Sequence, residues 1–210
     1  LNNLDLVVRD LSSGQMATLL RGTPAASWFQ PRFSNDGHRV AYRWAEGPMD
    51  RRQVSLRVIG TEPGATAQIV LPQVSASPRG WSPDGKAIRV FLTPQELAWV
   101  SIEDKSVRTV KAFEKWQEVH DASVSPDGRF IAYSARPVSG SNDKYIYVMD
   151  ATGQRETAVV KTAGSRGWPI WRPDGTQVFF RGDRGIPGAS ALWSIRIRDG
   201  EAVGEPWIVK

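Results

Sequence analysis

Four short segments of the chain repeat one turn sequence, and this repeat constrains the fold more than any other feature. The segments are FSNDG, WSPDG, VSPDG and WRPDG, and they begin at residues 33, 81, 124 and 171. Proline presets the backbone angle of a tight turn, and glycine supplies the left-handed conformation that closes a hairpin. In the first copy Asn35 replaces proline, which keeps the turn and loses only the preset angle. Each segment therefore predicts a turn between two antiparallel strands.

The sequence between these turns also repeats. The turn aspartates, at positions 36, 84, 127 and 174, are 48, 43 and 47 residues apart, and an alternating strand follows each turn. A second hairpin follows in every repeat, at residues 54–59 with 67–71, 97–102 with 107–110, 145–150 with 157–160, and 192–197 with 206–209. Four strands at a period of about 40 to 50 residues are typical of a β-propeller blade, whereas a β-sandwich would lack the long period. The sequence thus predicts an all-β propeller of four-stranded antiparallel blades.

The predicted blades do not add up to a whole number. The repeats place blades at residues 23–72, 73–114, 115–163 and 164–210, while residues 1–22 match only the second hairpin of a blade. Together they make one propeller domain of about four and a half blades. A half blade leaves an unpaired strand edge, which closed propellers avoid. We therefore expect the chain to be a fragment of a larger propeller, or to pair its open edge with another copy by self-association.

Composition excludes several classes of protein. The 210 residues include no Cys, which excludes a disulfide framework, a thiolate metal site and a cysteine nucleophile. Lys and Arg outnumber Asp and Glu by 27 to 22, but the basic residues are scattered, and the tightest cluster is Arg51-Arg52. No basic run could neutralise a nucleic-acid backbone, so no nucleic-acid partner is expected. No apolar stretch approaches the roughly 20 residues that cross a bilayer, so no membrane span is expected.

The repeat resembles that of a known family. The aromatic-Ser-Pro-Asp-Gly turn with its alternating strand is similar to the TolB-type, WD-repeat-like propeller repeat, which also occurs in propellers of the prolyl oligopeptidase and tricorn protease type. Residues 191–206 resemble a blade ending of bacterial multi-blade members. The resemblance covers essentially the whole chain and implies the propeller fold, but such repeats serve binding, scaffolding and substrate gating alike. Since TolB relatives act in the periplasm, the resemblance also implies a periplasmic or otherwise extracytoplasmic location.

The loops that join blades run to the innermost strands, so we expect them to line the mouth of a central channel. Their aromatic and charged residues are Trp28, Arg32, Arg79, His120, Asp121, Arg166 and Trp168. Aromatic and Arg side chains that converge on a concave opening are typical of recognition sites, and Arg can grip a carboxylate with two hydrogen bonds. These residues form our candidate ligand-binding site for a peptide or an anionic group. In the alternative interpretation each Trp packs between blades and each Arg is a solvated rim charge.

Two further sets of residues recur with the blades. The aromatic position of the repeated turn holds Phe33, Trp81, Val124 and Trp171, for which we expect packing between neighbouring blades. The longer loops inside the blades, at residues 45–52, 93–95, 136–144 and 182–190, are a second candidate binding surface on a rigid scaffold.

Residues suited to catalysis or metal binding are sparse. His38 follows a turn glycine, where we expect an exposed residue, and Glu118, His120 and Asp121 form a cluster of the kind that often arises by accident. The sequence contains no Gly-x-Ser-x-Gly nucleophile motif and no glycine-rich phosphate loop. We therefore expect no catalytic residue, no metal, no cofactor and no enzymatic activity.

Three functional classes are compatible with these features. The first is a non-catalytic, TolB-like binding or scaffold module that presents its channel mouth and loop face to a protein or peptide partner. The second is a substrate-gating propeller of a prolyl oligopeptidase-like or tricorn-like serine peptidase whose catalytic domain lies outside these residues. The third is a sensory propeller of a larger bacterial regulator. Flanking sequence would separate them, since a downstream Gly-x-Ser-x-Gly segment favours the peptidase.

Overall fold

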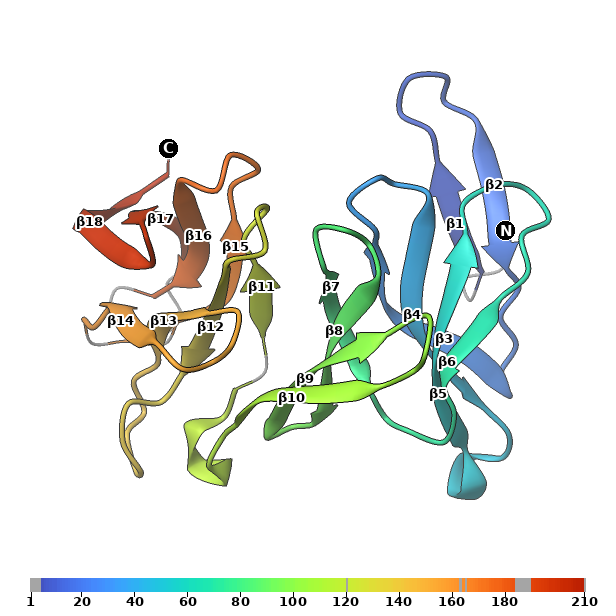
Figure 1. The fold of residues 1–210 in the computed structure, drawn as a ribbon, viewed down its shortest axis with the longest axis horizontal. Helices are drawn as coiled ribbons and strands as arrows, with labels where there is room; N and C mark the ends of the chain where they lie inside the picture. The colour runs from blue at the N-terminus through green and yellow to red at the C-terminus, as the bar shows by residue number, and fades with distance from the viewer. Residues whose placement is uncertain (1–4, 120, 163, 165, 184–189, 210) are drawn as a thin grey trace. The chain divides into compact units, whose positions relative to one another are not determined.

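The structure is a computed structural model that describes residues 5–119, 121–162, 164, 166–183 and 190–209. It contains five antiparallel sheets, one of two strands and four of four strands (Figure 1). The chain divides into two compact units, which are described separately. The first comprises Leu1–Thr93 and Leu97–Arg108, and the second comprises Pro94–Glu96 and Thr109–Lys210.

The first unit contains the two-stranded sheet, one complete four-stranded sheet and most of another. Strands β1 and β2 form a hairpin, and the next sheets have the orders β3-β4-β5-β6 and β7-β8-β9-β10. The bounds are β1 (Leu6–Arg9), β2 (Met16–Leu20), β3 (Ala26–Phe33), β4 (Arg39–Glu46), β5 (Gln53–Gly60), β6 (Gln68–Leu71), β7 (Ser77–Trp81), β8 (Ala87–Thr93), β9 (Glu96–Ser101) and β10 (Val107–Ala112).

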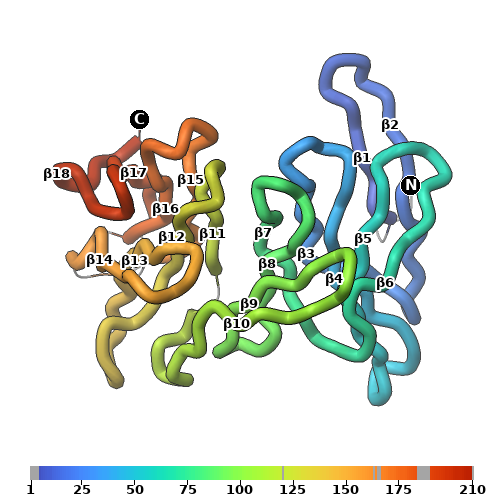
Figure 2. Tube along the Cα trace, viewed as in Figure 1, coloured from blue at the N-terminus to red at the C-terminus, as the bar shows by residue number. Residues whose placement is uncertain are grey.

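The second unit begins within this last sheet and contains two complete sheets, β11-β12-β13-β14 and β15-β16-β17-β18. Their strands follow one another along the chain as consecutive hairpins (Figure 2). The bounds are β11 (Ala122–Val124), β12 (Phe130–Ala135), β13 (Tyr145–Asp150), β14 (Glu156–Val160), β15 (Arg166–Trp171), β16 (Gln177–Gly182), β17 (Ala191–Arg198) and β18 (Glu201–Ile208). The predicted strand pairs are confirmed in every repeat.

Helical structure is limited to two short 3-10 turns in the described residues, η1 (Met49–Arg51) and η2 (Lys115–Gln117). No helix in the described ranges is long and apolar enough to cross a bilayer.

Each repeated turn is held by hydrogen bonds inside its own segment. In the second copy the Ser82 hydroxyl donates to the Asp84 carboxylate at 2.5 Å, and Asp84 also accepts the Lys86 backbone N–H at 3.0 Å. The Ser82 oxygen in turn accepts the Ala87 N–H at 2.9 Å, and Gly85 has a φ of 67°. The hairpin prediction is thus confirmed. The aspartate does more than fit the turn, because it satisfies donors that the turn leaves unpaired.

Buried tryptophans join consecutive sheets within each unit. Trp81 is 2% exposed and packs with Ala41 and Leu56, while its indole N–H donates to the Arg32 carbonyl at 2.9 Å. Trp171 is also buried, and its indole N–H donates to the Ser123 carbonyl at 3.2 Å. Packing between sheets is therefore confirmed for both tryptophans.

The same expectation is wrong for Phe33, whose side chain is 56% exposed. Trp81 and Trp171 each hydrogen-bond to the first strand of the preceding four-stranded sheet, β3 and β11. The sheet that precedes Phe33 contains only β1 and β2, so it offers no equivalent strand. Val124, at the same position of the third copy, is half-buried.

Candidate functional site

The predicted site residues lie on or next to the first strands of the sheets. Trp28 and Arg32 are on β3, and Arg79 is on β7, all in the first unit. In the second unit Asp121 directly precedes β11, and Trp168 is on β15.

Two predicted residues are not described at their side chains. His120 lies outside the described residues, and for Arg166 only the backbone, as the first residue of β15, is described.

Irregularities in these first strands determine where their side chains are directed. The pairing of β3 with β4 shifts between Phe29 and Arg32, and the pairing of β15 with β16 shifts between Gly167 and Ile170. Within these bulges Gln30 has a φ of 55° and Trp168 a φ of 51°. A left-handed backbone is costly for a side chain other than glycine, and such positions cluster at binding sites. β-Bulges also redirect side chains away from the regular ladder.

Trp168 is the most exposed of the predicted aromatic residues. Its side chain is 54% exposed, and the guanidinium carbon of Arg181 lies 5.0 Å from its ring centroid. The Nε–H of Arg181 donates to the Ser190 hydroxyl at 2.6 Å, which holds the guanidinium in place. The pair presents a flat apolar ring beside a positive charge, a combination that suits a peptide or an anionic group.

Similar pairs occur in the first unit. The Arg43 guanidinium lies 4.8 Å from the Phe29 ring, and the half-buried Arg79 guanidinium lies 5.4 Å from the Phe91 ring. Three sheets therefore place an arginine over an aromatic ring at their first two strands. Arg79 and Trp168 were predicted from the sequence. Phe29, Arg43 and Arg181 were not, because the pairing of an arginine with an aromatic ring depends on strand register.

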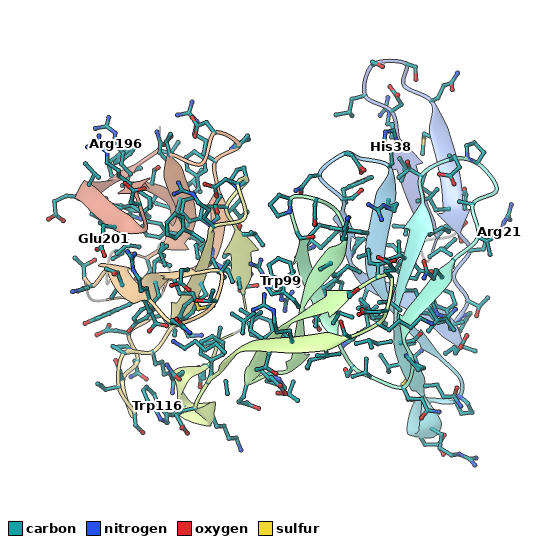
Figure 3. The ribbon with its side chains drawn as sticks, viewed as in Figure 1. Arg21, His38, Trp99, Trp116, Arg196 and Glu201 are labelled. Carbon is teal, nitrogen blue, oxygen red and sulfur yellow. The ribbon has the colours of Figure 1, made fainter. Side chains whose placement is uncertain are left out.

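The other predicted residues of the first unit have plainer surroundings. Trp28 is half-buried against the cluster of Leu6, Val40 and Tyr42, as the alternative interpretation has it. Arg32 is exposed, and its guanidinium donates to the Pro31 carbonyl at 2.8 Å. His38 is exposed beside its turn, as expected (Figure 3).

Arg89 of β8 is a fully buried arginine that was not predicted from the sequence. Its guanidinium lies 5.7 Å from the ring of Trp99, which Figure 3 labels on β9, and donates to the Arg79 carbonyl at 3.4 Å. Its Nε and one Nη have no hydrogen-bond partner among the described residues. Burial, and then the charge of Arg79, lower the pKa of Arg89 to about 9.

A partly buried polar cluster joins β10 to the β11–β14 sheet. The Lys111 ammonium and the Tyr133 hydroxyl both contact the Glu156 carboxylate, and the Tyr133 and Tyr147 rings stack at 5.3 Å. Burial lowers the pKa of Lys111 and raises that of Tyr133. Each polar atom here has a partner inside the group, which is typical of a structural contact between blades.

Glu118, from the candidate metal cluster, is paired with cations. Its carboxylate lies 2.9 Å from the Arg136 guanidinium and 3.7 Å from the Lys144 ammonium. In the part of the chain that the structure describes, no group of three or more His, Cys, Asp or Glu side chains is close enough to hold a metal ion.

Neither a protein-family model nor a curated protein sequence matches the chain. Solved structures do. An oligogalacturonate lyase in complex with manganese aligns with a TM-score of 0.70 at 13% identity, over 96% of this chain and 59% of the lyase. TolB from Acinetobacter baumannii aligns at 0.60 and 20% identity, over 92% of this chain and 51% of TolB. Pyrococcus horikoshii acylaminoacyl peptidase aligns at 0.61 and 15% identity, over 88% of this chain and 32% of the peptidase.

These likenesses identify the fold. The chain has the TolB-like β-propeller fold, built of four-stranded antiparallel sheets as the repeat predicts. It spans 59% of the oligogalacturonate lyase chain. At such low identity the neighbours carry no information about activity, because one fold serves many functions.

Proposed function

We propose that this chain is a non-catalytic β-propeller binding module whose first strands present aromatic and guanidinium side chains to a protein or peptide partner. One observation carries the proposal: Trp168 is 54% exposed on a left-handed bulge, with the Arg181 guanidinium 5.0 Å from its ring. An exposed Trp on a strained backbone is costly to a protein that gains nothing from it.

The chemistry of the proposed surface suits peptide recognition. Trp and Arg are enriched among the few interface residues that carry most of the binding energy. The bulge lies in a four-stranded sheet, so the ring is displayed from a rigid strand. Arg181 adds positive charge beside the ring, which favours a partner with carboxylates.

Selection from a random peptide library on the immobilised protein tests the proposal. We expect enriched peptides to lose at least about tenfold in affinity for Trp168→Ala and Arg181→Ala, as for residues at the centre of an interface. The melting temperature of both variants should stay close to that of the parent. Ile170→Ala is the matched control, since Ile170 is 60% exposed on the same strand.

Two results would overturn the proposal. One is that no peptide is enriched, and the other is that enriched peptides bind Trp168→Ala as tightly as the parent. If both test variants simply unfold, these residues serve packing instead.

A substrate-gating propeller is the alternative, because the peptidase aligns with a TM-score of 0.61, as well as TolB does at 0.60. The two proposals differ in what accompanies the propeller in the full gene. A Gly-x-Ser-x-Gly hydrolase segment in the same polypeptide would favour the gate.

The proposal also includes an extracytoplasmic, periplasmic setting, which the TolB-like repeat supports, and the absence of catalysis, which the lack of a nucleophile motif in the sequence supports. Cell fractionation of the source organism tests the location. Hydrolysis of a peptide or glycoside substrate by the purified chain, abolished by one point mutation, would show that the module is an enzyme.

A further inference from the structure

A cavity of about 310 Å³ lies at the repeated turns of the second unit, between the β11–β14 and β15–β18 sheets. Its apolar lining includes Phe130, Trp171 and Ile197, and the Phe130 and Trp171 rings stack with centroids 6.4 Å apart. The backbone of Gly175 also borders the cavity. This cavity is separate from the surface proposed above, which lies on the bulge of β15.

The equivalent junction in the first unit is filled by an arginine side chain. Arg39 occupies the same turn position as Phe130, since each backbone N–H donates to the hydroxyl oxygen of its turn serine, at 2.9 Å. The Arg39 guanidinium lies 4.9 Å from the Trp81 ring and donates to the Gly85 carbonyl at 3.0 Å. Gly85 is buried beneath it, and a Cβ built there would lie 2.6 Å from Arg39 Nη2.

The second unit has the same tryptophan and glycine at its junction, but Phe130 stands at the position of Arg39. Trp171 replaces Trp81, and Gly175 replaces Gly85, at identical positions of the turn. Gly175 is only half-buried, and a Cβ built there would meet nothing closer than Pro126, at 3.7 Å. The internal repeat thus shows which chemical group this junction accommodates: a guanidinium, over the indole and against the glycine carbonyl.

Charged side chains also line the cavity. Its lining includes three carboxylates and two guanidiniums, from Asp127, Asp174, Asp199, Arg129 and Arg198. Arg129 is 64% exposed and pairs with Asp127 at 2.7 Å and Asp199 at 3.6 Å. Asp174 pairs with the half-exposed Arg172 at 3.2 Å. Exposed pairs of this kind are weak, so an incoming guanidinium can take a share of these carboxylates.

We propose that this cavity is a receptor for the guanidinium of an arginine residue in a peptide or protein partner. The bound group would enter the cavity beside the Phe130 and Trp171 rings and donate to the Gly175 carbonyl, as Arg39 does to the Gly85 carbonyl, and to the Asp174 carboxylate. Backbone and hydroxyl hydrogen bonds from Thr176 lower the pKa of Asp174, which keeps that carboxylate charged at neutral pH.

Nuclear magnetic resonance titration of the whole chain tests the proposal with N-acetyl-arginine amide as the probe. We expect saturable shifts of the Trp171 indole and Gly175 amide signals. The neutral isostere N-acetyl-citrulline amide should cause none.

Two variants sharpen the test. Phe130→Arg should fill the cavity from within, as Arg39 does, and abolish the titration. Asp174→Asn should weaken the affinity by about tenfold, the effect of losing one charge-assisted hydrogen bond. Asp84→Asn is the matched control, because it makes the same change in the turn at the junction that Arg39 already fills, and it should leave the affinity unchanged.

Two results would overturn the proposal: equal binding of the citrulline probe, or undiminished binding to a folded Phe130→Arg variant. If Phe130→Arg does not fold, equal affinities of Asp174→Asn and Asp84→Asn decide against it. Since none of these variants touches Trp168, the outcome is independent of the function proposed above.

Discussion

At the scale of single residues, Arg89 has an unusual environment. It is fully buried, and no salt bridge to it occurs among the described residues, where its interactions are the Trp99 ring and the Arg79 carbonyl. A buried charge without an opposite partner costs more in desolvation than its hydrogen bonds return. The residue therefore lowers the stability of the fold.

Replacing it gives the first prediction. Arg89→Met keeps much of the volume and removes the charge, so we expect the free energy of unfolding to rise by about 1–4 kcal/mol. Arg89→Ala leaves a cavity and should lack this gain. Chemical denaturation measures both, and a large loss of stability in Arg89→Met would show that the charge is needed.

The titration of Arg89 supplies an independent check. Its pKa in the folded state is about 9, below the ordinary 12.5, because of burial and then the charge of Arg79. Above pH 9 the unfolded chain holds more protons than the folded one, so stability increases as the pH rises through this window. The Arg89→Met variant should lose that increase.

The turn aspartates differ from Arg89, because the fold stabilises their charged form. Hydrogen bonds from the Ser82 hydroxyl, and then from the Lys86 backbone, lower the pKa of Asp84 below 3.8. This contribution to stability is present above pH 3.8 and is lost as the pH falls through the lowered value. We expect Ser82→Ala to raise the pKa of Asp84 in carboxyl NMR titrations and to shift acid unfolding to higher pH. Asp174, whose turn has Arg172 in place of serine, is the internal control and should titrate as before.

At the scale of secondary-structure elements, one glycine sets the contact between a turn and a neighbouring strand. Gly153, in the β13–β14 turn, has a φ of 79°, and a Cβ built there would lie 2.4 Å from the Val110 carbonyl oxygen of β10. Gly140 has nearly the same φ, 80°, with nothing within 4 Å of its Cβ position. Substitutions at these two glycines therefore separate the cost of backbone strain from the cost of a steric contact with β10.

We expect Gly140→Ala to lower the free energy of unfolding by about 1 kcal/mol, the strain of a left-handed residue. Gly153→Ala should lose about 1–3 kcal/mol more, because β10 has to move away. Thermal unfolding of the two variants measures the difference. Equal losses in the two variants would mean that β10 moves away without a loss of stability.

The elements also show what sequence can predict. The turns and both hairpins of each repeat were predictable because their determinants are local: Ser82, Asp84 and Gly85 close their turn by themselves. The arginine–aromatic pairs were not, because Phe29 meets Arg43 only through the register of β3 with β4. The open junction was missed for the same reason, since it depends on which residue faces Trp171 from the preceding sheet.

At the scale of the molecule, the two-stranded sheet differs from all the others. Strands β1 and β2 pair only with each other, and Phe33, on the strand that follows, is 56% exposed. A two-stranded sheet is marginal by itself and tends to recruit further strands. We expect the chain to self-associate there, with a weight-average mass in sedimentation that rises with concentration.

Phe33→Ser should weaken this association. Leu11→Ser is the control, because Leu11 is 94% exposed in the β1–β2 turn and should matter little. A chain that stays monomeric at every concentration, or equal effects of the two substitutions, would contradict the prediction.

The self-contained turns have a consequence for how such chains evolve. The hydrogen bonds of a turn lie within six residues, so a duplicated blade brings its scaffold with it and needs nothing from its new neighbour. The first residue of the strand after the turn, Arg39 in one copy and Phe130 in another, contributes only its backbone to these hydrogen bonds, so its side chain can change. A change in one codon can therefore open or close the junction between two blades while the architecture is inherited intact.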